Sequence, residues 1–314
     1  MNYSIAIDLG GTFIKIGLLK NGTLIDRKEF PAQSASGLKS QLPDLKFAID
    51  QLILANQLSS SNILGIGFSF AGLVDSSKNR IISTNQKYDD APDTDLVAWA
   101  RSNWNCHLFA ENDARMALLG EWKHGAGQKY ENIVLVTLGT GIGSAVLIEG
   151  KLMKGKHFQA GNLGGHFVVN HKGSVCTCGN IGCVEAEAST WRLPSLLKEH
   201  PDFLESSMKE EILDFKTLFH HAMKDDRVAK EVLEHCLSVW AAGIITMIHA
   251  FDPELVILSG GIMKSSSSIM PAFQEKVNHL AWTPWGKVKL VEAKFPDSAA
   301  LYGADYLVRS LIKY

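Results

Sequence analysis

The pattern of apolar and polar positions along this chain of 314 residues occurs twice. In residues 7–25 an apolar run leads into a glycine-rich turn, a second apolar run and a tight Asn21-Gly22 turn. Residues 136–153 have the same order, with Glu149-Gly150 at the tight turn. Short apolar runs joined by an x-Gly pair predict β-hairpins. Two equivalent hairpin units indicate a duplicated α/β architecture.

Outside the two hairpins, apolar periodicity predicts helices and further strands. Because no Pro-rich or low-complexity linker divides the chain, the repeat itself places the domain boundary. We expect an N-terminal domain over residues 1–115, to which the C-terminal helix can return, and a C-terminal domain over residues 116–314. Helices are expected over residues 37–58, 113–122, 209–223, 228–251, 269–280 and 299–312, and strands over residues 63–68, 108–109 and 255–258.

Composition and charge argue against several classes of protein. With 46% hydrophobic and 20% charged residues and a net charge of −2, the chain resembles an ordinary soluble globular protein. Without a block of like charge, nothing indicates binding to nucleic acid or to an anionic membrane. The N-terminus does not resemble a signal peptide, and the longest apolar window, residues 239–251, is too short to span a bilayer. We therefore expect a cytoplasmic protein with no nucleic-acid or membrane partner.

The two glycine-rich turns are candidate phosphate sites. Glycines let backbone N–H groups approach a phosphate closely, and threonine hydroxyls donate further hydrogen bonds. One such turn alone is as easily explained as an ordinary tight turn, but two copies in register favour phosphate binding. The turns consist of Gly10, Gly11 and Thr12 in the first copy and of Gly139, Thr140, Gly141 and Gly143 in the second.

The end of the first strand carries a carboxylate, Asp8, beside the first turn. A carboxylate in this place can hold Mg²⁺ directly or through water, because this hard cation keeps several of its waters. Neither turn matches the P-loop pattern, and neither is a G-x-G-x-x-G segment that opens a helix. The sequence therefore argues against a P-loop enzyme and against a dinucleotide-binding fold.

Three of the five cysteines lie between residues 176 and 183, which in a cytosolic protein favours a metal over disulfides. Cys176, Cys178 and Cys183, together with His166, supply the thiolates and imidazole that tetrahedral Zn²⁺ prefers. Four protein ligands leave no open coordination position, so we expect a structural ion. His171 is nearer in sequence, but its spacing fits a solvated loop residue equally well. Three ordinary free cysteines are the other alternative.

Two further carboxylates are candidates for chemistry. Asp113 follows a predicted strand at the start of a helix, where aspartate is also common as an N-cap. If the chain transfers phosphoryl groups, Asp113 is placed to accept the proton of the attacking hydroxyl. Glu185 lies two residues after Cys183, in a segment that a bound metal would hold rigid. Side chains of this kind hydrogen-bond sugar hydroxyls in buried pockets, since unpaired polar groups there are costly.

These motifs resemble those of the ROK family of sugar kinases and sugar-responsive repressors, over nearly the full chain. The family members that the chain resembles are glucokinases, fructokinases and N-acetylmannosamine kinases. This resemblance implies an α/β, actin/hexokinase-like (ribonuclease H-like) fold. In this fold two duplicated domains have an ATP cleft between them. Residues 8–12 with Lys15 are similar to the family's first phosphate motif, and residues 138–143 to the second. The Gly260-Gly261 turn is similar to the adenosine motif.

The resemblance also implies roles for single side chains. Asp113 is implied to be the general base and Asn112 a sugar contact. His166 is implied to be both a zinc ligand and a neighbour of the sugar, with Glu185 as a further sugar contact. Asn85 matches a sugar-binding asparagine of the family. The implied cofactors are ATP, Mg²⁺ and a structural Zn²⁺, and the implied assembly is a homodimer.

One segment departs from the family pattern. Many ROK kinases carry Gly-Glu-x-Gly-His, whose Glu binds sugar hydroxyls, whereas here Asn162 or Leu163 occupies that place, depending on where an extra glycine is inserted. A neutral or apolar group thus replaces a charged acceptor. We favour Asn162 as a substrate contact, because an amide still donates and accepts hydrogen bonds. The identity of the sugar stays open.

The sequence therefore favours an ATP-dependent kinase, a phosphotransferase acting on a hydroxyl, most plausibly that at C6, of a hexose or N-acetylhexosamine. A sugar-responsive transcriptional regulator is one alternative, but the first strand begins near residue 3 and leaves no room for an N-terminal helix-turn-helix domain. A catalytically silent sugar-binding protein is the second alternative. Asp8, Asp113 and the two intact turns argue against it.

Overall fold

The computed structural model describes residues 3–84 and 86–312, with the backbone alone at residues 266–268. The chain forms two compact units. Unit 1 comprises Met1–Lys129, Lys154–Ala160 and Asp297–Tyr314, and unit 2 comprises Tyr130–Met153 and Gly161–Pro296. The boundary that we predicted after residue 115 lies inside a helix of unit 1, which extends beyond it. Unit 1 also contains the last helix of the chain.

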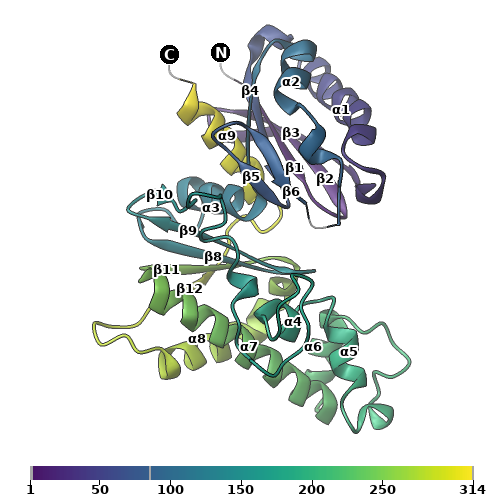
Figure 1. Cartoon of the computed structure of the whole chain (residues 1–314), viewed down its shortest axis with the longest axis vertical. Helices are drawn as coiled ribbons and strands as arrows, with labels where there is room; N and C mark the ends of the chain where they lie inside the picture. Colours follow the sequence, from purple (N-terminus) through teal and green to yellow (C-terminus); the bar gives the residue numbers. More distant parts are fainter. Residues whose placement is uncertain (1–2, 85, 313–314) are drawn as a thin grey trace. The chain divides into compact units, whose positions relative to one another are not determined.

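Unit 1 is built on a five-stranded mixed sheet of order β3-β2-β1-β4-β7 (Figure 1). The central strand β1 pairs antiparallel with β2 and parallel with β4, and β4 in turn pairs parallel with β7. A separate two-stranded ribbon is formed by β5 and β6. The strands of unit 1 are β1 (Tyr3–Leu9), β2 (Phe13–Lys20), β3 (Thr23–Pro31), β4 (Ile63–Phe70), β5 (Leu73–Asp75), β6 (Arg80–Ser83) and β7 (His107–Asn112).

The two faces of this sheet carry side chains of different size. Ile5 and Ile7 of β1 belong to one hydrophobic core together with Leu45 of the helix α1 (Leu42–Ala55). On the opposite face, a Cβ atom added to Gly67 of β4 would meet the Cβ of Ala304 in the helix α9 (Ala299–Leu311) at 2.6 Å. Figure 1 shows α1 and α2 on one side of the sheet and α3 and α9 on the other. Small residues thus allow α9 to pack closely against the strands.

The helices of unit 1 connect the strands and close its two layers. Between β4 and β7 the chain makes the β5-β6 ribbon and α2 before it returns to the sheet. The helices are α1 (Leu42–Ala55), α2 (Leu96–Trp104), α3 (Asp113–His124) and α9 (Ala299–Leu311), with the short 3-10 helices η1 (Ser34–Ser36), η2 (Lys39–Gln41), η3 (Ser60–Asn62) and η4 (Ala91–Asp93).

Unit 2 repeats the arrangement of unit 1, with a sheet of order β10-β9-β8-β11-β12. Here β8 pairs antiparallel with β9 and parallel with β11, as β1 does with β2 and β4. The strands of unit 2 are β8 (Ile133–Leu138), β9 (Ile142–Ile148), β10 (Lys151–Leu152), β11 (Leu255–Ser259) and β12 (Lys289–Glu292). Its helices are α4 (Val184–Ala188), α5 (Leu193–Lys198), α6 (Phe215–Met223), α7 (Arg227–Phe251) and α8 (Ser266–Leu280), with η5 (Gly164–His166), η6 (Phe203–Glu205) and η7 (Gly261–Ser265).

Both predicted hairpins are present, and their tight turns have the same backbone. Asn21 and Gly22 join β2 to β3 with φ angles of 51° and 80°, and Glu149 and Gly150 join β9 to β10 with φ angles of 49° and 70°. A left-handed φ at both central residues is the type I′ turn that suits the twist of a hairpin. The duplicated α/β architecture that the repeat predicted is therefore confirmed.

The longest helix, α7, forms the centre of the unit 2 core. Its Trp240 is buried and donates a hydrogen bond from Nε1 to the carbonyl of Ala188 at 2.8 Å. By length and composition α7 is the one helix in the described part of the chain that could cross a membrane, and half of its most apolar window is buried. The apolar window that we judged too short to span a bilayer, residues 239–251, is only the second half of this helix. A core helix meets the same criterion, so this is weak evidence for a membrane span.

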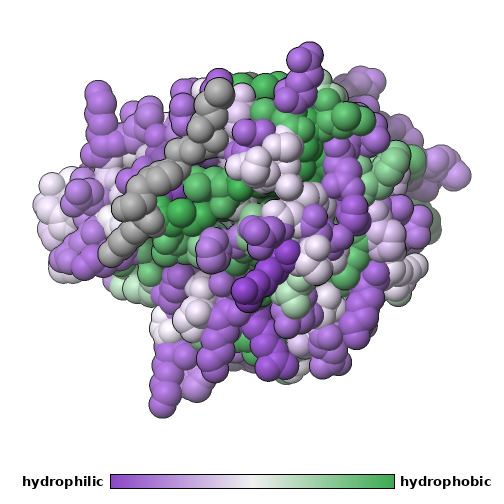
Figure 2. All heavy atoms as spheres, turned by 90° about the horizontal axis from the view of Figure 1, so that it is seen from above, coloured by the Kyte–Doolittle hydropathy of each residue, from purple (hydrophilic) through white to green (hydrophobic). Residues whose placement is uncertain are grey.

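Helix and strand boundaries differ from our predictions where side chains outside the apolar pattern decide them. The helix predicted over residues 209–223 begins only at Phe215, because Asp214 accepts a hydrogen bond from the Thr217 amide at 2.8 Å and caps it. Helices α2, α4 and α5 and strands β5, β6 and β12 were not predicted. Figure 2 shows a face on which hydrophilic side chains predominate, with hydrophobic groups between them. Scattered exposed apolar groups of this kind are normal.

Candidate functional site

Three parallel strands of unit 1 end in polar side chains that share one row of the sheet. The register pairs Asp8 of β1 with Ser69 of β4, and Ser69 with Glu111 of β7. The Ser69 hydroxyl donates a hydrogen bond to Asp8 Oδ1 at 3.0 Å. Residues at the same level of neighbouring parallel strands are close in space, so the strand ends bring Asp8 and the residues after β7 together. The first glycine-rich turn follows Asp8 directly.

Asp113 is the first residue of α3, and the N-cap is its neighbour Asn112. The Asn112 side chain accepts a hydrogen bond from the Arg115 amide at 3.2 Å and donates to the Gly72 carbonyl at 3.0 Å. It also donates to Asp113 Oδ1 at 2.9 Å, and the Ala114 amide donates to the same oxygen at 2.8 Å. The capping role that competed with a chemical role for Asp113 therefore belongs to Asn112.

The two carboxylates of this site influence each other. Burial raises the pKa of Asp113 from its ordinary value of 3.8 to about 6, and the negative charge of Asp8 acts in the same direction. The hydrogen bonds from Ala114 and Asn112 offset only part of this. Burial also raises the pKa of Asp8, against the lowering effects of Lys15 and of the Ser69 hydroxyl. A carboxyl group that titrates near neutral pH is suited to proton transfer.

Hydrogen bonds to its carbonyl groups hold the first hairpin turn in place. Tyr88 donates from its hydroxyl to the Gly10 carbonyl at 2.9 Å, and Ser34 from its hydroxyl to the Gly11 carbonyl at 3.2 Å. The amide of Ala32 donates to the Thr12 carbonyl at 2.8 Å. Lys15, opposite Asp8 in the β1-β2 ladder, donates from Nζ to the Asp297 carbonyl at 3.0 Å. All five residues of the first motif that were predicted to bind nucleotide, Asp8, Gly10, Gly11, Thr12 and Lys15, thus lie in unit 1 with Asp113.

A buried ion cluster behind Asp113 was not predicted. Glu111 and Arg115 are both fully buried; their side chains approach to 3.4 Å, and Lys154 Nζ lies 2.9 Å from Glu111 Oε2. Arg115 also donates to the Ala160 carbonyl at 2.7 Å, so it fixes the returning segment Lys154–Ala160 to α3. The signal in the sequence was an acid and an arginine four residues apart, but nothing local shows that they are buried.

In unit 2 the second hairpin turn is open at Gly139, whereas a Cβ atom added to Gly141 would meet Glu185 Oε2 at 2.5 Å. A Cβ atom added to Gly139 would meet only the Gly141 carbonyl oxygen, at 3.9 Å, and one added to Gly261 would meet nothing within 4 Å. The Gly143 amide donates to Thr137 Oγ1 at 3.1 Å. Gly260 has a φ of 97° and lies against Leu138. The predicted second phosphate turn and the predicted adenosine turn therefore adjoin each other within unit 2.

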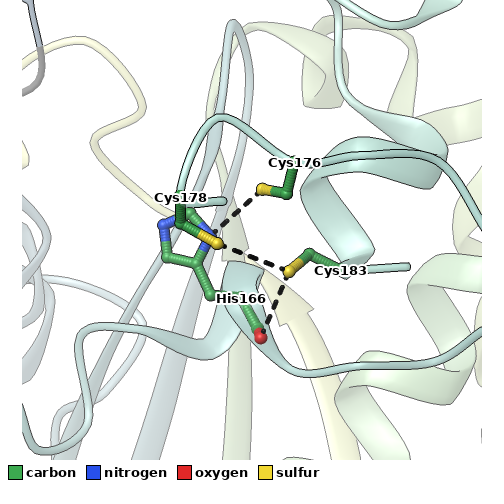
Figure 3. A group of neighbouring side chains, drawn as sticks. All are labelled: His166, Cys176, Cys178 and Cys183. Carbon is green, nitrogen blue, oxygen red and sulfur yellow. Dashed lines mark hydrogen bonds between the residues drawn. The ribbon is translucent and has the colours of Figure 1, made fainter. Parts of the chain in front are cut away.

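Four side chains of unit 2 gather their donor atoms at one point (Figure 3). His166, Cys176, Cys178 and Cys183 each offer one ligand atom, and these atoms all lie within 4.8 Å of one another. Cys176 Sγ is 3.5 Å from His166 Nδ1, and Cys178 Sγ is 3.7 Å from Cys183 Sγ. His171 is not a member of this group. The four residues predicted as a metal site are thus brought together.

The loop that carries the cysteines is shaped by glycine. Gly179 and Gly182 have φ angles of 86° and 70°, and a Cβ atom on Gly182 would collide with the backbone of Asn170. These left-handed positions return the chain so that Cys183 comes back to Cys176 and Cys178. The Cys176 amide donates to the Asn180 carbonyl at 2.8 Å within the loop.

The donor set fits a tetrahedral metal ion. Around an ion with Zn–S bonds of about 2.3 Å and a Zn–N bond of about 2.0 Å, the ligand atoms are separated by about 3.5–3.8 Å. The two distances of 3.5 and 3.7 Å match this. Burial raises the pKa of Cys183 to about 12 in the protein without metal. Burial also opposes ionisation of Cys178, but hydrogen bonds from Asn180 and the neighbouring thiols lower its pKa.

Glu185 links the cysteine loop to the second hairpin. It is buried, and its Oε2 accepts a hydrogen bond from the Ile142 amide at 2.8 Å. Thr177 donates to its Oε1 at 3.3 Å. The segment before His166 packs on β9, where Ser144 donates to the Gly161 carbonyl and accepts from the Gly164 amide, both at 2.8 Å.

Of the remaining predicted sugar contacts, the structure describes the position of Asn162 but not that of Asn85. Asn162 is buried, whereas Leu163 is partly exposed. Asn85 lies outside the described residues. The roles predicted for these side chains therefore stay predictions.

Comparison with known proteins places the chain in a family. The model of the ROK family matches residues 4–310. The chain belongs to the ROK family. A glucokinase of Thermotoga maritima is 29% identical to it over 315 residues, which are 98% of this chain and 98% of that protein. The xylose repressor of Bacillus subtilis is 26% identical over 98% of this chain and 77% of the repressor.

The solved structure of a ROK hexokinase from Thermus thermophilus is similar throughout. It superposes with a TM-score of 0.81 at 25% identity, over 98% of this chain and 99% of that chain. The resemblance on which the sequence analysis relied is therefore confirmed, as is the α/β, actin/hexokinase-like fold with two units. Kinases and repressors both occur among the relatives.

The raised pKa of Asp113 can be measured directly. We predict that the Asp113 carboxyl titrates with an apparent pKa of about 6 in a ¹³C NMR titration. Asp8→Asn should lower this pKa, because it removes a neighbouring negative charge while burial remains. As a control, Asp44→Asn, on the exposed first turn of α1, should leave it unchanged. An Asp113 pKa near 4 in the native protein would contradict this description of the site.

Proposed function

We propose that this chain is an ATP-dependent sugar kinase that transfers the γ-phosphoryl group to a hydroxyl, that at C6, of a hexose or N-acetylhexosamine. The observation that carries the proposal is the partly buried Asp113 at the strand ends, whose pKa desolvation and the charge of Asp8 raise to about 6. Membership of the ROK family and similarity to glucokinase and hexokinase relatives support a phosphotransferase with a sugar acceptor.

Asp113 has one oxygen ready to take a proton. Both hydrogen bonds that it accepts, from Ala114 and Asn112, go to Oδ1. We assign Oδ2 as the atom that accepts the proton as the sugar oxygen attacks the γ-phosphorus and the bond to ADP breaks. Asn112, held by Gly72 and Arg115, sets the rotamer of this base. Its Oδ1 retains a second lone pair with which it can contact the sugar.

The phosphates are assigned to the glycine-rich turns. In unit 1 the turn residues, with Asp8 and Lys15, would bind nucleotide phosphate and Mg²⁺. The carboxylate of Asp8 and the Ser69 hydroxyl are the hard oxygen donors that Mg²⁺ and its waters prefer. When bound, Mg²⁺ would neutralise charge on the phosphates. In unit 2 the turns at Gly139–Gly143 and at Gly260-Gly261, which have open space at Gly139 and Gly261, are assigned to phosphate and adenosine respectively.

Several polar side chains are assigned to the sugar. Since His166 Nδ1 is the ring nitrogen near Cys176, its Nε2 is the nitrogen assigned to a sugar hydroxyl. Glu185 accepts one hydrogen bond at each oxygen and keeps further lone pairs for hydroxyl groups. Asn162 and Asn85 are proposed as further contacts. The homodimer and the cytoplasmic location also stay proposals.

A structural Zn²⁺ at His166, Cys176, Cys178 and Cys183 is the second part of the proposal. Its support is the donor set and the two donor distances close to those of a tetrahedron. The ion would stabilise the loop from which Thr177 holds Glu185. It would take no part in proton or phosphoryl transfer.

A sugar-responsive regulator is the alternative that one observation favours, because a xylose repressor matches 98% of this chain. A silent sugar-binding protein would need the same scaffold. Neither function requires a partly buried carboxyl group whose pKa is raised to about 6. That group is the feature which favours catalysis.

Asp113→Asn should reduce kcat by about 10²- to 10⁴-fold, the usual contribution of a general base. We would measure ADP release over a panel of hexoses and N-acetylhexosamines, together with calorimetric sugar binding, which should be retained. Asp44→Asn, a matched loss of one carboxylate from an exposed position of α1, should keep native turnover. Near-native turnover of Asp113→Asn on the accepted sugar would exclude Asp113 as the base.

This variant should also remain folded. The folded-state pKa of about 6 exceeds the ordinary value of 3.8, so the proton-linked stability present below pH 4 is lost as pH rises to about 6. Above pH 6 the ionised carboxylate destabilises the fold, and the neutral amide removes that effect. Thermal unfolding at pH 7 should show Asp113→Asn to be at least as stable as the native chain.

Metal analysis tests the zinc assignment. The native chain, after reconstitution and removal of loose metal, should hold about one Zn²⁺, and Cys183→Ser should lose it and melt at a lower temperature. Cys106→Ser, which changes a cysteine outside the cluster, should retain the metal. If the native chain bound no Zn²⁺, or if Cys183→Ser kept a full equivalent, the assignment would be wrong.

A further inference from the structure

A lysine that no motif indicated lies on the first phosphate turn. The side chain of Lys87 crosses Gly11 so closely that a Cβ atom on that glycine would meet Lys87 Cε at 2.9 Å and Cδ at 3.0 Å, and would collide with Nζ. Lys87 is partly buried rather than extended into solvent. The absence of a side chain at position 11 is what makes room for the ammonium group.

The backbone around Lys87 is held in an uncommon conformation. Gln86 and Tyr88, on either side of it, both have a φ of 56°, in the left-handed region that residues other than glycine rarely adopt. Tyr88 is buried and is tied to the turn by its hydroxyl, which donates to the Gly10 carbonyl at 2.9 Å. Its amide donates to the Ser34 carbonyl at 2.8 Å. Backbone of this kind is often found at binding sites and persists where surrounding contacts hold it, here those of Tyr88.

The polar groups at this turn are arranged for an anion. The carbonyls of Gly10, Gly11 and Thr12 all accept hydrogen bonds from the protein. In the described part of the chain, the amides of Gly11 and Thr12 donate no hydrogen bond, and Lys87 has neither an ion-pair nor a hydrogen-bond partner. The carbonyl acceptors of the turn are thus satisfied, whereas its N–H donors are available, as in other backbone sites that bind phosphate.

The other lysine of the turn is already engaged. Lys15 donates to the Asp297 carbonyl at 3.0 Å and faces Asp8 across the ladder. Its charge therefore offsets that of a carboxylate. The positive charge of Lys87 has no such counterpart among the described residues. A phosphoryl group at this turn would supply one.

We propose that Lys87 binds the terminal phosphoryl group of the nucleotide, and that it is a specificity-determining residue that distinguishes a nucleoside triphosphate from the diphosphate. The proposal rests on the proposed kinase function and assigns a residue to it. A lysine ammonium is a compact charge with three donors, which suits a phosphoryl group that changes position during transfer. The same ammonium would stabilise the negative charge on the group as it moves to the sugar oxygen.

Calorimetry with a non-hydrolysable ATP analogue tests this without turnover. Magnesium AMP-PNP and magnesium ADP would be titrated into the native chain, Lys87→Met and Lys87→Arg. Lys87→Met should weaken AMP-PNP binding by about 10- to 100-fold, the effect of losing one charged hydrogen bond, and ADP binding by less than about 3-fold. Lys87→Arg should recover most of the AMP-PNP affinity. Lys78→Met, at an exposed turn position of the same unit, should change neither affinity.

Equal weakening of AMP-PNP and ADP by Lys87→Met, or no weakening of either, would overturn the proposal. So would a change confined to the affinity for the sugar, which would make Lys87 a sugar ligand instead. Melting temperatures of both Lys87 variants close to that of the native chain would show that the turn is intact. If no sugar were phosphorylated and the selective loss of AMP-PNP affinity persisted, the kinase function would fail while the phosphate assignment stood.

Discussion

The register of three parallel strands in unit 1 is the constraint on which the site depends. Since β1, β4 and β7 run side by side and in step, Asp8, Ser69 and Glu111 occupy one row, and Asp113 follows Glu111 by two residues, at the start of α3. Desolvation at these strand ends raises the pKa of Asp113 to about 6, which suits this carboxyl group to proton transfer. A slip of one residue in β4 or β7 would turn these polar groups to the opposite face.

The same sheet in unit 2 has been put to a different use. Thr137 stands where Asp8 stands in unit 1, and its hydroxyl accepts a hydrogen bond from Gly143 rather than facing a second carboxylate. The glycine turns of unit 2 have open space at Gly139 and Gly261, and polar groups near them include the Cys/His cluster and Glu185. The two units therefore share one strand order. In the proposed function, however, they have different roles, with proton transfer in unit 1 and structural metal binding in unit 2.

The sequence predicted the features that depend on neighbours along the chain. The x-Gly hairpins and the gathering of Cys176, Cys178 and Cys183 follow from local backbone geometry, and both are present. It did not predict the return of Lys154–Ala160 to unit 1, which depends on the buried contact of Arg115 with Ala160. Lys87 was also missed, because its place beside Gly11 arises from packing between segments far apart in sequence.

The central claim, that this chain moves a phosphoryl group from ATP to a sugar, is tested most directly by following the phosphorus itself. In ³¹P NMR of the native enzyme with magnesium ATP and each sugar of the panel, one sugar should give a phosphomonoester resonance that grows in step with ADP. The coupling of that resonance to the sugar protons would show whether the C6 hydroxyl is the acceptor. Formation of inorganic phosphate alone, or unchanged ATP with every hexose and N-acetylhexosamine, would show that the chain is not a kinase of these sugars.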